Sequence, residues 1–309
     1  VLAFALGLFA RAVRSDLEIP PQIQAYLSIF LLLAIGLKGG VALRGQAPGE
    51  LLLLLSVTIA AGVATTFTSY VIARRILREG RIDAAAMAAH YGSVSAVTFI
   101  AANQFVERAG DPAEGVLVAL VVALEVPALL LALWLAHRGS HSGAGTDARH
   151  DTLREVFTGK SVILLVGGLA IGAIAGPGGI KSVDAMYFAL FQGVLMLFML
   201  DMGILAAGRL AALRQGWLKL TRVATAVPVL HGAAGVVLGH VVGLSASGAT
   251  VLGAMVSSAS YIAAPATVRT GLPEADTGRC ITAALGITFP FNLAIGIPLY
   301  ALMARWLAR

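Results

Sequence analysis

Long apolar runs recur along the whole chain and constrain its fold more than any other feature. Crossing the hydrocarbon core of a bilayer takes about 20 helical residues. Nine stretches have this character, and a tenth, at the start of the chain, is an incomplete apolar run: 1–13, 22–43, 50–73, 82–105, 113–137, 158–176, 184–206, 217–239, 246–268 and 278–303. They predict an all-α integral membrane protein with ten transmembrane helices, the first of them incomplete.

The composition agrees with a chain whose solvent is lipid. Apolar residues make up 58% of the 309 residues and charged residues only 12%, whereas soluble proteins are about a quarter charged. The net charge of +6 does not indicate nucleic-acid binding, because the basic residues lie between apolar runs. The chain has no Walker A loop, HExxH motif, nucleophile elbow or paired-carboxylate pattern, so we expect neither an enzyme nor a cofactor.

Positive residues between the predicted spans are distributed unequally. If the helices alternate in direction, sixteen Lys and Arg residues face one side and five face the other. The larger set is Arg11, Arg14, Arg74, Arg75, Arg78, Arg81, Arg138, Arg149, Arg154, Lys160, Arg209, Arg214, Lys219, Arg222, Arg269 and Arg279, and the smaller is Arg44, Arg108, Lys181, Arg305 and Arg309. This bias predicts that the first side lies in the cytoplasm and that both termini lie outside.

The two halves of the sequence resemble each other. A shift of about 164 positions aligns rare features. Gly7 falls on Gly172, Lys38 near Asp201, Pro127 near Pro290, and YGSVSAVTFIAA on VSSASYIAAPA. We predict repeat 1 at 1–137 with helices 1–5, a polar cytoplasmic linker at 138–156 and repeat 2 at 157–309 with helices 6–10. A metal site at His141 and His150 is the alternative for the linker.

Because each repeat has five helices, an odd number, the second must insert in the opposite orientation. Inverted repeats are typical of secondary transporters, whose substrate site lies where the repeats meet. We therefore expect the two halves to share a polar site at mid-membrane.

Helices 4 and 9 are the least lipid-like segments. Gly92 and Pro265 weaken a continuous helix, and irregular backbone persists at membrane depth only where protein or a water-filled cavity surrounds it. We predict that both helices are interrupted and cross each other, with half-helix N-termini facing an anion. Four hydroxyl groups would add donors: Ser93, Ser95, Ser258 and Ser260. The alternative is that these small residues only allow close helix packing.

Glu125 lies deep in the fifth span, two residues before Pro127. An ionised carboxylate there costs about 3 kcal/mol or more unless it is paired or hydrated. Carboxylate, hydroxyl and carbonyl oxygens are ligands that a small alkali ion prefers, which predicts a sodium site. The other side chains of this site would be Thr98, Asn103 and Thr288. A hydrogen bond from Glu125 to a neighbouring helix is the structural alternative.

Two further pairs of residues have alternative interpretations. Lys38 and Asp201 occupy matched positions, where they form an ion pair or gate in one interpretation and extend to the aqueous phase in the other. His90 and His231 either relay protons or are hydrogen-bonded packing residues.

Six stretches resemble, in order and spacing, those of the SbtA-type sodium-dependent bicarbonate transporters. They are IGLKGG, YGSVSAVTF, EVPAL, PVLHG, VSSASYIAAPATVRTGLP and GITFPFNLAIGIPLY. The similarity extends from Val1 to the last helix. It implies a homotrimeric symporter with a core and a gate domain that imports bicarbonate with sodium by an elevator-like mechanism.

The resemblance also implies binding residues and a partner. The bicarbonate site would comprise Gly92, Ser93, Val94, Ser95, Ser257, Ser258 and Ser260. Glu125 stands where the family commonly has an acidic residue before Ile-Pro or Val-Pro, and it would bind sodium. A small PII-like trimer that senses adenine nucleotides would dock on the cytoplasmic face.

The resemblance departs at Tyr261, where members of the family tend to have Asp. Two alternatives therefore stay open. One is a proton- or sodium-coupled carrier of another small anion or carboxylate. The other is a membrane receptor or scaffold without transport, which the lack of an obvious large soluble domain disfavours.

Overall fold

The computed structural model describes residues 1–45, 47–138, 154, 156–211 and 217–309. All regular secondary structure in this part of the chain is helical. Eight helical segments there are long and apolar enough to cross a membrane, and Leu2–Ala12 and Ala246–Ser257 are shorter apolar helices. Arg214 and most of the predicted linker, with His141, Arg149 and His150, lie outside the described residues.

Each predicted span contains one helix or a consecutive series of helices. The first half forms α1 (Leu2–Ala12), α2 (Pro21–Leu43), α3 (Pro48–Ile72), the π-helical η1 (Ala73–Leu77), α4 (Arg81–Gly92), α5 (Ala96–Arg108) and α6 (Leu117–His137). The second half forms α8 (Lys160–Ile180), η2 (Lys181–Val183), η3 (Ala185–Ala189), α9 (Phe191–Ala211), α10 (Trp217–Val241), α11 (Ala246–Ser257), α12 (Ala263–Gly271), α13 (Thr277–Ile281), η4 (Thr282–Thr288), α14 (Phe289–Phe291), η5 (Asn292–Gly296) and α15 (Ile297–Leu307).

Three spans differ in shape from regular helices. The span predicted at 184–206 becomes a regular α-helix only at Phe191. The last span alternates between α- and π-helix, and it contains Pro290 and Pro298, which lack the N–H that a regular ladder needs. In α8, Gly176 has a φ of 65° directly before Pro177, and the Arg44 guanidinium occupies the space a side chain would take. The helical path therefore breaks where the predicted span ended.

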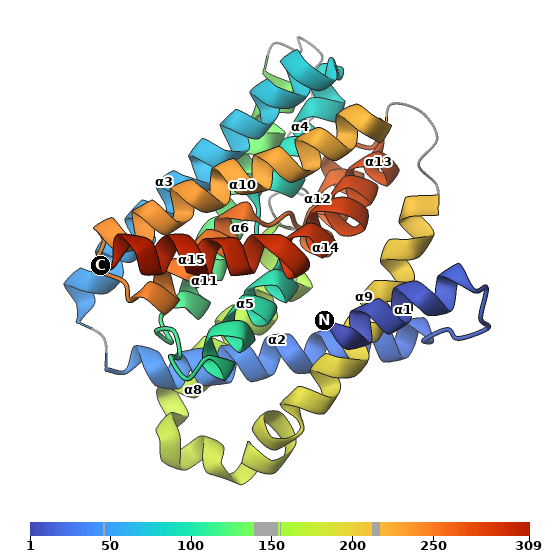
Figure 1. Cartoon of the computed structure of the whole chain (residues 1–309). Helices are drawn as coiled ribbons and strands as arrows, with labels where there is room; N and C mark the ends of the chain where they lie inside the picture. The colour runs from blue at the N-terminus through green and yellow to red at the C-terminus, as the bar shows by residue number, and fades with distance from the viewer. Residues whose placement is uncertain (46, 139–153, 155, 212–216) are drawn as a thin grey trace.

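The helices pack as two groups (Figure 1). α1 packs along α9 and α2 along α8, and we call these four the four-helix group. The central group comprises α3 to α6 and α10 to α15, in which α3 packs on α4 and α6, and α10 packs on α11 and α15. The two groups meet where α9 contacts η4 and where α6 contacts α8.

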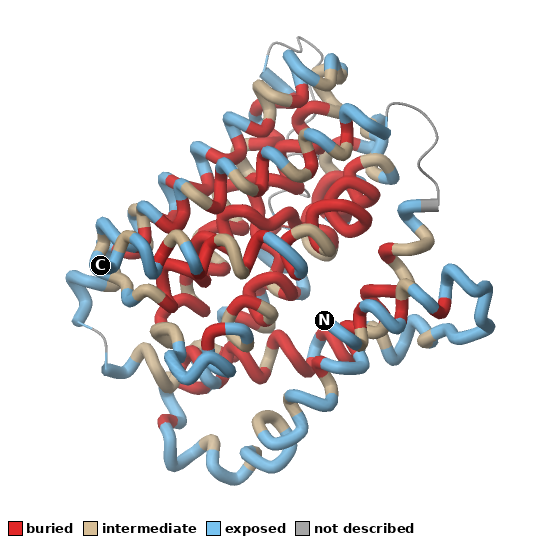
Figure 2. Tube along the Cα trace, in the orientation of Figure 1, coloured by how far each residue is buried: buried red, intermediate tan, exposed pale blue. Residues whose placement is uncertain are grey.

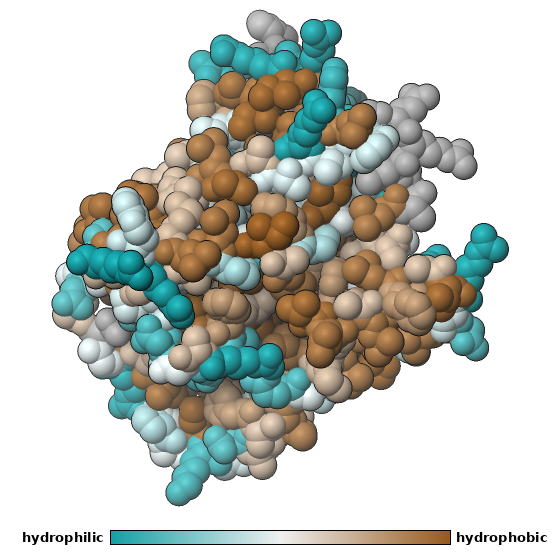
Figure 3. All heavy atoms as spheres, in the orientation of Figure 1, coloured by the Kyte–Doolittle hydropathy of each residue, from teal (hydrophilic) through white to brown (hydrophobic). Residues whose placement is uncertain are grey.

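Burial separates the centre of the molecule from a lipid-like exterior. All residues of α4 from Ala84 to Gly92 are buried, as is α11 from Ser247 to Ser257 (Figure 2). On the face shown in Figure 3, hydrophobic residues cover most of the middle and hydrophilic residues gather toward the ends. Outer helices expose large apolar side chains, including Leu2, Phe9, Leu52, Ile174, Leu230 and Trp306. This distribution is typical of a multi-pass membrane protein.

Two carboxylates of the loop between α5 and α6 hold the N-terminus of α11. Glu114 accepts a hydrogen bond of 2.6 Å from the Ser245 backbone N–H, and Asp111 accepts one of 2.7 Å from the Ser247 hydroxyl. A negative charge at a helix N-terminus is stabilising because it complements the helix dipole. This contact fixes the start of a buried half-helix.

We expect Glu114→Ala to lower the free energy of unfolding by about 1 kcal/mol, because it removes a charged hydrogen bond at a partly exposed helix end. Thermal unfolding in detergent measures the effect. Glu274→Ala, a change at an exposed loop carboxylate, is the matched control. Equal stability of the two variants would contradict this role for Glu114.

Candidate functional site

The first helix interruption separates α4 from α5. α4 ends at Gly92, residues 93–95 are extended or irregular, and α5 begins after its N-cap residue Ser95. The Ser95 hydroxyl oxygen accepts a hydrogen bond of 3.2 Å from the Thr98 N–H. Gly92 packs so closely on Thr66 of α3 that a Cβ atom would overlap the Thr66 side chain. Packing against α3 therefore requires glycine at the last residue of α4.

The second interruption separates α11 from α12 and lies at residues 258–262. The prediction of a break in this span is confirmed, but Pro265 is not its centre. Pro265 is the third residue of α12, in the first turn, where the missing N–H costs no helical hydrogen bond. The Ser260 hydroxyl oxygen accepts a hydrogen bond of 3.2 Å from the Ala264 N–H at the start of α12.

The two interruptions are hydrogen-bonded to each other. The Ser260 N–H donates to the His90 carbonyl at 2.7 Å, and His90 Nδ1 donates to the Ser260 carbonyl at 2.6 Å. The Ser95 N–H donates to the Ser258 hydroxyl oxygen at 2.8 Å. α5 packs on α11, and α4 packs on α12. The broken helices therefore cross, and polar backbone at the crossing is satisfied between them.

The crossing leaves a small inner cavity beside the N-termini of α5 and α12. Its volume is about 10 Å³, room for about one water molecule. The lining residues are Leu32, Val94, Ser95, Ala96, Glu125, Ser161, Ser260, Tyr261, Ile262 and Ala263. Two half-helix N-termini give this cavity partial positive charge, and one carboxylate adds an oxygen ligand for a cation. The lining groups have the chemistry to bind an anion and a small cation, and the cavity must widen to hold both.

Glu125 is buried in α6, with 3% of its surface exposed. No hydrogen bond or ion pair joins it to any residue in the described part of the chain. It lines the inner cavity and also a side cavity of about 440 Å³ that includes Thr158, Lys160 and Thr267. Pro127 lies inside α6 and cannot donate to the Ala123 carbonyl. The structure therefore does not contain the hydrogen bond from Glu125 to a neighbouring helix that was the structural alternative.

The predicted bicarbonate residues fall into two sets. Val94, Ser95 and Ser260 line the inner cavity with Glu125. Gly92, Ser93, Ser257 and Ser258 are buried in the crossing beside it. The hydroxyls of Ser257 and Ser258 donate to the carbonyls of their own helix at 2.9 and 2.7 Å.

The other predicted sodium ligands lie outside the lining of the inner cavity. Thr98 is buried in the first turn of α5, and its N–H is taken by Ser95. Asn103 lines a separate cavity with Lys38. The Thr288 hydroxyl donates to the Ala224 carbonyl and accepts from the Tyr91 hydroxyl, both at 2.7 Å.

Lys38 and Asp201 do not pair with each other. Lys38 is exposed and lies 3.4 Å from Glu107. Asp201 is buried, and its Oδ1 accepts a hydrogen bond of 2.7 Å from Gln24 Nε2. An ion pair between Lys38 and Asp201 was therefore the wrong interpretation, because the two side chains line different cavities.

Both histidines have packing partners. His90 is wholly buried and bonds Ser260 across the helix crossing. His231 lies 2.8 Å from the Thr68 hydroxyl, between α10 and α3. The hydrogen-bonded packing interpretation describes both residues.

A cationic vestibule of about 390 Å³ adjoins the inner cavity. Tyr261 and Ile262 line both spaces and form the wall between them. Three positive side chains line the vestibule, Lys160, Arg209 and Arg269, and all three belong to the side predicted to be cytoplasmic. Asp201 is in the same lining.

The sequence analysis did not predict that Ser161 lines the inner cavity, or that Tyr261 lines both the inner cavity and the vestibule. Ser161 directly follows Lys160 at the start of α8 and lines the inner cavity. Its sequence signal is only one polar residue at the edge of an apolar run. Tyr261 follows the last serine of the second interruption, so its place in the serine tract was the usable signal.

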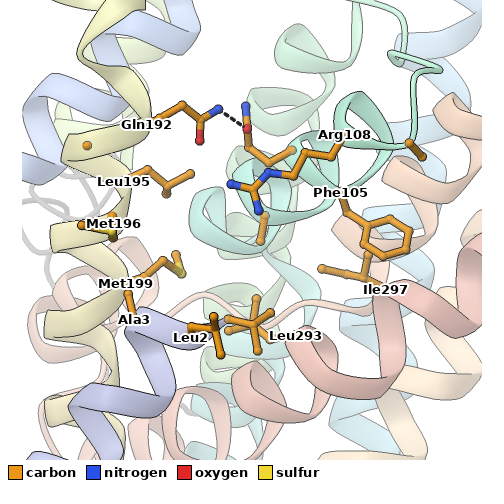
Figure 4. Close-up of a pocket in the computed structure, with 15 residues that line it drawn as sticks. Leu2, Ala3, Phe105, Arg108, Gln192, Leu195, Met196, Met199, Leu293 and Ile297 are labelled. Carbon is orange, nitrogen blue, oxygen red and sulfur yellow. Dashed lines mark hydrogen bonds between the residues drawn. The ribbon is translucent and has the colours of Figure 1, made fainter.

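A larger cavity lies elsewhere, between α1 and α9 on one side and α5, η5 and α15 on the other (Figure 4). It measures about 730 Å³ and its lining is mainly apolar, with Arg108 and a hydrogen bond from Gln192 to Gln104 near one end. None of the predicted site residues lines it. The crossing, with its converging polar groups, is therefore the better candidate site.

Comparison with known families gives one match, and it covers nearly the whole chain. The family model of the Na+-dependent bicarbonate transporter superfamily matches residues 1–305. No curated protein matches the chain. The family match covers both helix interruptions, the inner cavity and both groups of helices, and it confirms the resemblance found in the motifs. The chain belongs to the Na+-dependent bicarbonate transporter superfamily.

Proposed function

We propose that this chain is a secondary active transporter that imports bicarbonate together with sodium. The observation that carries this proposal is the inner cavity, where two half-helix N-termini, the Ser95 and Ser260 hydroxyls and the Glu125 carboxylate converge. The half-helix ends and hydroxyls bind the anion, and Glu125 binds sodium. The coupling ion is transported cargo, and the protein needs no cofactor. Membership in a transporter superfamily supports transport rather than catalysis.

Charge compensation provides the coupling. Bicarbonate beside the ionised Glu125 carboxylate would place two negative charges in a region of low dielectric, which is costly. Sodium between them offsets one of these charges, so the site that holds both ions moves across the membrane more readily than the site that holds bicarbonate alone.

An inverted repeat of 1–137 and 157–309 has support in the helix packing. The first helix of each repeat packs against the second helix of the other: α1 on α9, and α8 on α2. Gly7 of α1 packs against the Leu200 carbonyl, and Gly172 of α8 packs against the Leu37 carbonyl. Reciprocal contacts of this kind are expected of two copies related by a two-fold axis in the membrane plane. Such an axis also places Lys38 and Asp201 on opposite sides.

The division into two groups supports an elevator-like mechanism. The central group holds the crossing and Glu125, and it would slide along the four-helix group, which acts as the gate domain. Tyr261 and Ile262 line both the inner cavity and the cationic vestibule. This arrangement corresponds to a state that faces the side of Lys160, Arg209 and Arg269.

The remaining features follow from the family resemblance, except the orientation, which follows from the unequal distribution of Lys and Arg. We assign the protein to a bacterial inner membrane with both termini outside, in contact with membrane lipid, and as a homotrimer. A PII-like regulator would bind the cytoplasmic face. Cross-linking in membranes measures the trimer, and labelling of single cysteines placed near each terminus measures the orientation.

A carrier of another small anion or carboxylate, coupled to protons or sodium, is the second candidate. The observation in its favour is Tyr261, which gives the inner cavity a neutral hydroxyl and leaves Glu125 as the one carboxylate in its lining. Uptake with and without a sodium gradient separates the two forms of coupling. A receptor without transport would instead tolerate bulky residues at Ser95 and Ser260.

The serine geometry gives a direct test. Ser95 and Ser260 accept hydrogen bonds from N–H groups, so their hydroxyl hydrogens are free to donate to an anion. We expect Ser95→Ala and Ser260→Ala each to raise the KM for bicarbonate about tenfold, because each removes a hydrogen bond to a charged group. Uptake of labelled bicarbonate by proteoliposomes under a sodium gradient measures it.

Ser56→Ala is the matched control. The Ser56 hydroxyl lies on α3 and donates to the Leu52 carbonyl, outside the site. We expect its KM to equal that of the wild type. The proposed anion site is wrong if all three alanine variants transport bicarbonate with the same KM.

A further inference from the structure

The Tyr261 hydroxyl is a buried polar group without a hydrogen-bond partner in the described structure. Tyr261 has only 9% of its surface exposed, and its ring packs edge-to-face on Phe289 with centroids 5.4 Å apart. A buried hydroxyl in a native protein normally has a partner, either in the protein or in a bound molecule. The missing partner therefore points to something that binds next to Tyr261.

The position of Tyr261 says where that partner lies. Tyr261 lines the inner cavity together with Ser95, Ser260 and Glu125. Its hydroxyl lies beside the Ser95 side chain without a hydrogen bond of normal geometry to it. The Ser95 oxygen accepts from the Thr98 N–H, and neither hydroxyl has an acceptor of normal geometry among the described residues, so each can donate its hydrogen into the same space.

The chemistry of these groups selects the class of ligand. Two hydroxyl donors and the N-termini of α5 and α12 form a donor-rich wall, which matches a small oxyanion with several acceptor oxygens. A cation, in contrast, requires acceptor oxygens, which the Glu125 carboxylate provides. Tyr261 therefore belongs to the anion part of the site.

We infer that the Tyr261 hydroxyl donates a hydrogen bond to an oxygen of the transported oxyanion, and that its ring closes the inner cavity toward the cationic vestibule. This inference rests on the proposed function and adds a binding residue specific to this chain. The ring is held by Phe289, so the hydroxyl is oriented before the anion arrives. Pre-orientation lowers the entropic cost of binding.

Tyr261→Phe tests the hydroxyl alone, because it keeps the ring and its contact with Phe289. We expect the KM for bicarbonate to rise about tenfold, as for the loss of a hydrogen bond to a charged group. The maximal rate and the sodium concentration for half-maximal uptake should stay within about twofold of the wild type, since the ring and Glu125 are unchanged. Bicarbonate-induced thermal stabilisation, measured on the purified folded protein, should weaken in parallel.

Tyr26→Phe is the matched control, because Tyr26 is about half exposed on α2 and does not line the inner cavity. A Tyr261→Phe variant with wild-type KM and wild-type thermal stabilisation by bicarbonate would overturn the inference while the proposed function stands. A wild-type protein that neither binds nor takes up bicarbonate would overturn both. An equal rise in the KM for bicarbonate in Tyr261→Phe and Tyr26→Phe would also overturn the inference, since the effect would not be specific to the site.

Discussion

We expect Glu125→Gln to abolish the dependence of bicarbonate uptake on sodium. Glutamine has nearly the same shape as glutamate but no negative charge, so it cannot hold sodium by charge in a buried site. The carboxylate forms no ion pair in the described part of the chain, although Lys160 lines the same side cavity, so a bound cation can supply the charge that compensates it. We expect sodium-stimulated uptake to fall at least about tenfold, because buried ion binding that loses its charged ligand loses more than about 1.4 kcal/mol.

The measurement is labelled bicarbonate uptake in proteoliposomes at several sodium concentrations. Glu50→Gln is the control, since Glu50 is an exposed carboxylate in the first turn of α3. Sodium-driven uptake that persists in Glu125→Gln would remove this mechanism. Uptake by the wild type that follows a pH gradient, and not a sodium gradient, would favour the proton-coupled alternative.

Composition and local sequence predict the helices and the places where they break. Runs of about 20 apolar residues mark the spans because bilayer thickness fixes the required length. The tract around Gly92 and the tract around Ser258 mark the interruptions because both are rich in Gly, Ala and Ser. Pro265 placed the predicted second interruption a few residues too late, since a proline is equally suited to the first turn of a helix that starts after the break.

The roles of individual serines depend on contacts between segments far apart in the sequence. Ser95, Ser257, Ser258 and Ser260 look alike as letters in two similar tracts. Only the three-dimensional arrangement shows that Ser257 and Ser258 use their hydroxyl hydrogens on their own helix, while Ser95 and Ser260 keep theirs free. Local sequence carries no information on which hydroxyl lacks an acceptor.

Partners of charged residues are similarly a tertiary property. Lys38 and Asp201 occupy matched positions, but matched positions of inverted copies are related by rotation and need not be neighbours. Glu107, the actual partner of Lys38, lies at the end of α5 and had no sequence signal connecting it to α2. Glu125 was identifiable because a carboxylate in a long apolar run is costly wherever the run folds.

Gly92→Ala is expected to disrupt both stability and transport. A Cβ atom at residue 92 would lie 2.7 Å from the Thr66 Cβ and 2.8 Å from the Thr66 Cα, and it would overlap the Thr66 hydroxyl. Thr66 is fully buried and its hydroxyl donates to the Gly62 carbonyl at 2.6 Å, so it has little room to move. We expect a loss of about 3 kcal/mol in the free energy of unfolding, at the upper end for overpacking, because backbone atoms are in the way.

Gly167→Ala separates this effect from the general consequence of adding a methyl group. Gly167 is in the interior of α8, and a Cβ atom there meets no atom within 4 Å. Because alanine favours helix over glycine by about 1 kcal/mol, Gly167→Ala should be as stable as the wild type or more so. Thermal unfolding in detergent measures stability, and proteoliposome uptake measures transport.

Gly92→Ala should also impair transport, because residue 92 sets where α4 ends and the Ser93–Ser95 segment begins. Displacement of α4 from α3 should move Ser95 away from Ser258 and lower uptake more than tenfold. If the Gly92→Ala protein unfolds at the same temperature as Gly167→Ala and transports at the wild-type rate, the interruption does not depend on the contact between residue 92 and Thr66.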